Sequence, residues 1–92
     1  MTQVVLDGRL LGERGQVRQA FAEAGLLPEW CGAGLDALFD ALTACPRPVH
    51  IRLLHPAALE QRLGGWGRAL CRMLRDACAE NPQLTLEELD AD

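Results

Sequence analysis

Two aspartates, Asp36 and Asp40, form the arrangement in this sequence that points most directly to chemistry. They lie four residues apart in a segment with helical periodicity, so both carboxylates project from one face of the expected helix. Like charges at this spacing destabilise a helix by about 0.2–0.5 kcal/mol. No basic residue occurs between Glu23 and Ala44 to offset that repulsion. The pattern fits an ordinary solvated helix face, and it also fits a docking surface for a cationic partner.

Trp30 lies in the loop that precedes this helix. Pro28 comes before it, and Gly32 and Gly34 follow. Tryptophan is enriched among residues that anchor protein–protein interfaces, but a tryptophan also commonly covers the edge of a core. The sequence therefore leaves two roles open for Trp30, an interface anchor beside the acidic helix or a residue that caps the core.

The cysteines and histidines offer less chemistry. The chain has four cysteines and two histidines: Cys31, Cys45, Cys71, Cys78, His50 and His55. The cysteines lack the ligand pair, roughly two to four residues apart, that structural zinc sites use. We therefore expect no metal ion and no other cofactor. Without an export signal, reduced and mostly buried thiols are expected rather than disulfides.

Catalytic motifs do not stand out either. The chain contains no serine, and no motif supports Cys45 with His50 as a nucleophile and base. The segment Gly64-Gly65-Trp66-Gly67 lacks the lysine and the spacing of a phosphate-binding loop. We expect no catalytic residues, and so a protein that is not an enzyme.

Length and composition predict one small globular domain over residues 1–92. Of the 92 residues, 49% are hydrophobic and 24% are charged, which is ordinary usage for a folded protein. No apolar run approaches the roughly 18 residues of a membrane span. The N-terminus lacks the basic and apolar stretches of a signal peptide. We expect a cytoplasmic protein without membrane contacts that is a monomer when free.

The charge distribution says more about partners than the net charge of -4 does. Every base is arginine, and the acidic balance argues against nucleic acid as the primary ligand. Residues 1–46 hold six acids and three bases, whereas residues 47–80 hold three acids and six bases. The segment 81–92 adds four acids and no base. The first half of the chain therefore offers an acidic surface to a basic partner.

Hydrophobic periodicity predicts the elements that position these side chains. Strands are expected at 3–6, 49–53 and 84–87, with helices from about 13–16 to 24, at 35–43, at 56–63 and from 66 to the Asn81-Pro82 pair. Strands that alternate with helices predict parallel pairing through right-handed crossovers. The alternating second and third strands predict one wet sheet face. We therefore expect an α/β, two-layer fold with a three-stranded parallel sheet and about four helices.

The segment Leu27–Thr43 resembles the signature of the barstar family, intracellular inhibitors of the secreted ribonuclease barnase. The family pattern is Leu-Pro-Glu-aromatic, an aromatic or other residue, Gly, two variable positions and Leu-Asp-Ala-Leu-aromatic-Asp. A weaker resemblance extends along the whole chain and includes Arg75-Asp76-Ala77 near the end of the last helix. The family's two-layer fold, with three parallel strands, is the fold that the resemblance implies for this chain.

The resemblance also implies a mechanism and a set of binding residues. In the family, the acidic helix and its preceding loop plug a ribonuclease active site lined with Arg, Lys and His. By match, Asp40 is the central carboxylate in the phosphate site, and Asp36 pairs with basic residues beside it. Trp30 packs on the catalytic His of the enzyme, Phe39 lies at the edge of the interface, and Asp76 adds an acidic contact from the last helix. The implied partner is a basic, barnase-like ribonuclease.

Four features depart from the family pattern and predict a related but different partner enzyme. Ala44-Cys45-Pro46 stands where the family has a Gly-Trp pair, and Gly34 replaces an Asn. Asp76 is one methylene shorter than the family's Glu, and the acidic tail 87–92 extends past the family's usual end. These departures also leave a second hypothesis, an interaction or regulatory module of the same fold that binds a protein other than a ribonuclease. A third hypothesis, metal-dependent catalysis through the Cys and His residues, predicts stoichiometric zinc.

Overall fold

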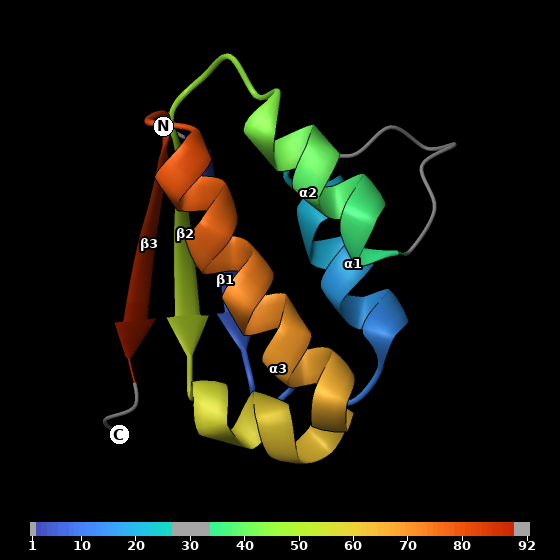
Figure 1. Cartoon of the computed structure of the whole chain (residues 1–92). Helices are drawn as coiled ribbons and strands as arrows, with labels where there is room; N and C mark the ends of the chain where they lie inside the picture. The colour runs from blue at the N-terminus through green and yellow to red at the C-terminus, as the bar shows by residue number, and fades with distance from the viewer. Residues whose placement is uncertain (1, 27–33, 90–92) are drawn as a thin grey trace.

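In the part of the chain that the structure describes, three parallel strands form a single sheet in the order β1-β2-β3 (Figure 1). The computed structural model describes residues 2–26 and 34–89. The strands are β1 (Thr2–Asp7), β2 (Val49–Leu54) and β3 (Leu84–Leu89). Ile51 is in register with Val4 on one side and with Leu86 on the other. The predicted three-stranded parallel sheet is confirmed.

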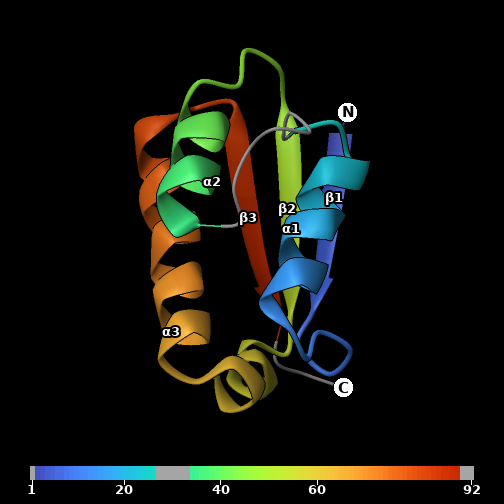
Figure 2. The same cartoon turned by 90° about the vertical axis from the view of Figure 1, so that its right-hand side faces the viewer.

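Within the described residues, three helices cover one face of this sheet (Figures 1 and 2). They are α1 (Arg14–Glu23), α2 (Leu35–Thr43) and α3 (Pro56–Glu80). The two-layer α/β class is confirmed, but the expected count of about four helices is corrected. The segments predicted at 56–63 and after 66 form one helix with a kink at Gly64. Gly64 adopts φ 61° and ψ -137°, a conformation that glycine reaches without a Cβ clash, so the helix turns within one residue.

The core lies between the sheet and the helices. Alternate strand residues are buried against the helices: Val4, Leu6, Val49, Ile51, Leu53 and Leu84. The helices contribute buried apolar side chains that include Val17, Phe21, Leu38, Leu42, Leu59, Leu70, Met73, Leu74 and Ala77. The intervening strand residues face the uncovered side, as the alternating pattern predicts.

Two glycines fix where the chain turns around this core. Gly25 has φ 78° directly after α1, the left-handed conformation that commonly ends a helix at glycine. Gly8 follows β1, and a Cβ built on it would lie 2.2 Å from the carbonyl oxygen of His55 and 2.7 Å from the backbone nitrogen of Leu59. The end of β1 therefore packs directly on the start of α3, which only glycine permits at this position.

Candidate functional site

Helix α2 presents its two aspartates to solvent and its leucines to the core. Leu38 and Leu42 are buried, whereas Asp36 and Asp40 are exposed. The helix begins after Gly34, which has no side chain to cap it, and Asp36 lies in the first turn. A carboxylate there interacts favourably with the helix dipole, but Asp40 lies beyond the reach of that effect.

The carboxylates of Asp36 and Asp40 have no neutralising partner among the residues that the structure describes. Neither takes part in an ion pair or a side-chain hydrogen bond. Three other acids in this part of the chain are paired: Asp7 with Arg9, Glu87 with Arg52, and Glu88 with Arg75. The acidic face of α2 therefore has no counter-charge in the described part of the chain, despite the repulsion between like charges four residues apart.

Asn81 fixes the C-terminal end of α2 to the turn between α3 and β3. Its side chain is buried, with 6% of its surface exposed. Its Nδ2 donates to the carbonyl oxygens of Leu42 at 2.9 Å and Cys45 at 3.0 Å, and its Oδ1 accepts from the Gln83 backbone N–H at 3.0 Å. The Leu42 carbonyl lies in the last turn of α2, and it also accepts a hydrogen bond from the Cys45 backbone N–H at 3.2 Å. Asn81 thus adds a second hydrogen bond to that carbonyl and ties the end of α2 to the turn between α3 and β3.

A groove of about 780 Å³ separates α2 from the C-terminal part of α3. It brings together three of the predicted binding residues, Asp36 and Phe39 from α2 and Asp76 from α3. Asp40 does not line the groove, but it lies one turn from Asp36 on the same face of α2. Trp30, the fifth predicted residue, lies outside the described residues.

Three arginines of α3 line the same groove, and two of them, Arg68 and Arg72, were not predicted from the sequence. They are Arg68, Arg72 and Arg75, spaced so that they share one side of the helix. Arg75 donates to both carboxylate oxygens of Glu88, at 2.6 Å and 3.2 Å, which raises the pKa of its guanidinium. That spacing of bases in the last helix is the sequence signal that identifies this wall of the groove.

A smaller hollow of about 450 Å³ lies at the C-terminal end of α2. It is lined by Gly25, Leu26, Ala41, Ala44, Cys45, Pro46 and Arg47. The lining includes Ala44, Cys45 and Pro46, the residues at which the sequence departs from the family pattern. The Arg47 guanidinium donates to the carbonyl oxygen of Gly25 at 3.0 Å and so closes one side of the hollow.

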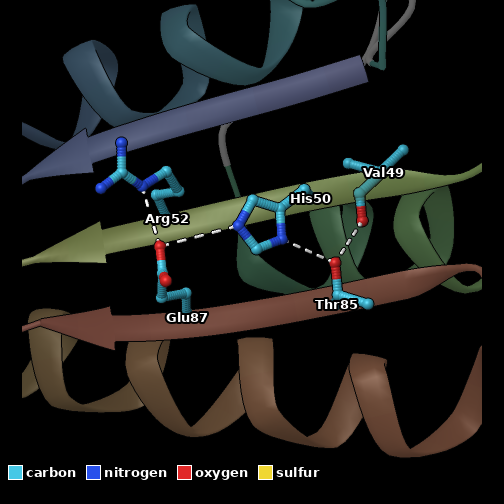
Figure 3. A network of polar contacts seen from close by, with 5 residues as sticks. All are labelled: Val49, His50, Arg52, Thr85 and Glu87. Atoms are coloured by element: carbon cyan, nitrogen blue, oxygen red, sulfur yellow. Dashed lines mark hydrogen bonds and ion pairs between the residues drawn. The ribbon is translucent and has the colours of Figure 1, made fainter. Parts of the chain in front are cut away.

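A polar cluster on the uncovered face of the sheet contains the residue types of a catalytic triad (Figure 3). The Nδ1 atom of His50 lies 2.8 Å from the Thr85 hydroxyl, and its Nε2 atom lies 3.7 Å from a Glu87 carboxylate oxygen. That oxygen also accepts a 2.9 Å hydrogen bond from Arg52. The 3.7 Å contact is too long for a hydrogen bond that would orient the imidazole. None of these residues lines either of the two hollows described above, and their contacts join β2 to β3.

The environments of Cys71 and Cys78 do not activate these two thiols as nucleophiles. Cys45, Cys71 and Cys78 are free, and Cys31 lies outside the described residues. Burial raises the pKa of the Cys71 thiol, and the Glu60 carboxylate raises it further; burial also raises the pKa of Cys78. A raised pKa keeps a thiol protonated, whereas the thiolate is the nucleophile and the metal ligand. Within the described ranges, no three His, Cys, Asp or Glu residues lie close enough to hold a metal ion.

The fold and the acidic face of α2 together define the class of protein. The chain is a small two-layer α/β protein with three parallel strands, whose second helix presents carboxylates without counter-charges. Comparison with protein families assigns it further: the model for barstar (barnase inhibitor) matches residues 1–88, and the chain belongs to this family. No curated protein sequence matches the chain. No helix within the described residues is both long and apolar enough to cross a membrane.

Proposed function

We propose that this protein inhibits a barnase-like ribonuclease by covering its RNA-binding active site with α2 and the loop before it. The observation that carries the proposal is the pair of unneutralised carboxylates on α2, in a chain that belongs to the barstar family. On this proposal the protein is a cytoplasmic binding protein rather than an enzyme, a monomer when free, and it needs no cofactor.

The mechanism is replacement of RNA phosphates by carboxylates. A ribonuclease holds RNA phosphates with cationic side chains, and the carboxylates of Asp40 and Asp36 offer those side chains the same charge. Asp40 enters the phosphate site, and Asp36 pairs with the basic residues beside it. Hydrogen bonds between ionised groups are roughly twice as strong as those between neutral groups, so few contacts are needed.

The remaining predicted residues surround these two carboxylates. Phe39 and Asp76 line the groove beside α2 and contact the rim of the enzyme, while Trp30 packs on its catalytic histidine. A positive enzyme surface and the acidic α2 face also attract each other before contact. Such complementarity speeds association, and desolvated charge pairs slow release.

Titration of a ribonuclease with the purified chain tests this proposal. We expect the hydrolysis of RNA by barnase to fall as the chain is added and to stop near equimolar amounts. The inhibition should weaken as salt is added, because ions screen the charges that attract the two proteins. Full ribonuclease activity in a large molar excess of the folded chain would contradict the proposal.

A second candidate function is binding of a protein that is not a ribonuclease. The hollow at Ala44-Cys45-Pro46 favours it, because this surface differs from the one that the family signature predicts. Identification of the protein that co-purifies with the chain from its native lysate separates the two candidates. A partner with ribonuclease activity supports the first candidate, and a partner without it supports the second.

A further inference from the structure

We propose that Arg68 and Arg72 bind carboxylates of the same partner, so that the ribonuclease this protein fits carries acidic groups beside its basic RNA site. This inference rests on the proposed function, because it concerns the surface next to the one that enters the active site. It adds a second set of charge contacts, on α3, that would restrict which ribonucleases the chain binds.

The geometry places both signs of charge in one groove. Asp36 and Phe39 form its α2 side, and Arg68 and Arg72 line its α3 side. Both arginines are exposed and lie four residues apart, so they project from the same side of α3. A protein surface that covers Asp36 therefore meets these two guanidinium groups as well.

Neither arginine is neutralised within the part of the chain that the structure describes. The side chains of Arg68 and Arg72 take part in no ion pair and no hydrogen bond there, although Asp36 and Asp76 line the same groove. Arg75 differs, because Glu88 of β3 binds its guanidinium through two hydrogen bonds. Of the three arginines in the groove, one has its counter-charge in this chain, and the other two are available to a partner.

Desolvation determines what that partner must supply. An exposed guanidinium is well solvated in the free protein, so it needs no counter-charge there. When a partner covers the groove, the water is removed, and a guanidinium without a counter-charge then opposes binding. A carboxylate fits this need best, because its two oxygens accept the parallel N–H donors of arginine. The partner surface that faces α3 is therefore acidic, whereas the surface that faces α2 is basic.

The direction in which binding changes after a charge reversal distinguishes this inference from a general attraction between an acidic chain and a basic partner. If the partner were uniformly basic, any Arg→Glu substitution would make the chain more acidic and would leave binding unchanged or tighter. If Arg68 and Arg72 meet carboxylates, their reversal places like charges together and weakens binding. Arg62 supplies the control, because it is an exposed arginine of α3 that does not line the groove.

The experiment measures the dissociation constant of the full chain with barnase, using the wild type, Arg68→Glu, Arg72→Glu and Arg62→Glu. We expect Arg68→Glu and Arg72→Glu each to weaken binding about tenfold, and Arg62→Glu to leave it unchanged or tighter. Circular dichroism establishes that each variant is folded, and Arg68→Ala and Arg72→Ala serve as milder variants with smaller losses in the same direction. Single Asp→Ala and Glu→Ala variants of barnase are then combined with Arg68→Ala and Arg72→Ala in double-mutant cycles. We expect at least one acidic residue of barnase to show a measurable coupling energy with Arg68 or Arg72.

The outcomes separate the inference from the proposed function. The inference alone is overturned if the wild-type chain inhibits barnase and the dissociation constants of Arg68→Glu and Arg72→Glu equal that of Arg62→Glu. No binding of barnase by the wild-type chain overturns the proposed function and this inference together. Selective weakening at the two groove positions supports both.

Discussion

Replacing Asp40 with alanine should remove most of the inhibition while leaving the protein folded. In the proposed complex, the Asp40 carboxylate lies in the cationic phosphate site of the enzyme. Its removal leaves desolvated positive charges of the enzyme without a partner, which costs about 3–5 kcal/mol for a buried pair and corresponds to a loss of affinity on the order of 100-fold or more. The inhibition constant against barnase measures this loss.

The stability of the Asp40→Ala variant should change in the opposite direction. The Asp40 carboxylate has no ion pair in the described part of the chain, and it lies four residues from Asp36 on α2. Alanine removes the repulsion between the two carboxylates and favours the helix, so the free energy of unfolding should stay equal or rise by about 0.2–0.5 kcal/mol. A residue that disfavours its own helix and is needed for binding has a functional role rather than a structural one.

Two further variants define the role of the Asp40 charge. Asp40→Asn preserves the shape of the side chain and removes its charge, and it should lose most of the inhibition that Asp40→Ala loses. Glu60→Ala is the matched control, because it removes a carboxylate from the first segment of α3, which does not line the groove. If Asp40→Ala inhibits as well as Glu60→Ala does, Asp40 is not at the binding site.

Replacing Asn81 with alanine should cause a large loss of stability. The substitution removes three hydrogen bonds, so the Cys45 carbonyl loses its side-chain donor and the Leu42 carbonyl keeps only the Cys45 backbone N–H. Lost hydrogen bonds of buried groups predict a fall in the free energy of unfolding of about 2–4 kcal/mol. Urea denaturation followed by circular dichroism measures this change, and the slope of the transition should stay the same if the native state keeps its compactness.

Gln83→Ala is the control for the Asn81 variant. The side chain of Gln83 is exposed, and its backbone N–H, which binds Asn81, is retained in the variant. Its unfolding free energy should remain within about 0.5 kcal/mol of the wild-type value, as for most surface substitutions. Equal stabilities of Asn81→Ala and Gln83→Ala would show that the tether between α2 and the α3–β3 turn contributes nothing.

Local sequence patterns were sufficient to predict most of the fold. The alternation of Val49, Ile51 and Leu53 with polar residues predicted β2 and the uncovered sheet face, because burial on one side follows directly from a period of two. The spacing of Leu35, Leu38 and Leu42 likewise predicted α2. The break predicted at Gly64-Gly65 is a kink within one helix, because a single residue with positive φ redirects the chain and helical hydrogen bonding resumes at once.

Contacts between distant residues could not be predicted in this way. Asn81 appeared in the sequence only as part of a helix stop, because its partners Leu42 and Cys45 lie 39 and 36 residues away. The meeting of Asp36 with Asp76 in one groove likewise depends on how α2 packs on α3. The family resemblance predicted Asp76 as a further acidic contact from the last helix, without its place in the groove beside Asp36. It did not supply Arg68 and Arg72, whose role depends on which charges remain unpaired after folding.

The proposed occupation of the RNA site by the chain is tested most directly by competition. The measurement is the binding of a fluorescent, non-cleavable oligonucleotide to barnase at increasing concentrations of the chain. We expect the chain to displace the oligonucleotide completely, with an apparent affinity that falls in proportion to the oligonucleotide concentration, and Asp40→Ala to displace it only at far higher concentrations. Binding of the chain to an enzyme that keeps its oligonucleotide would contradict the account.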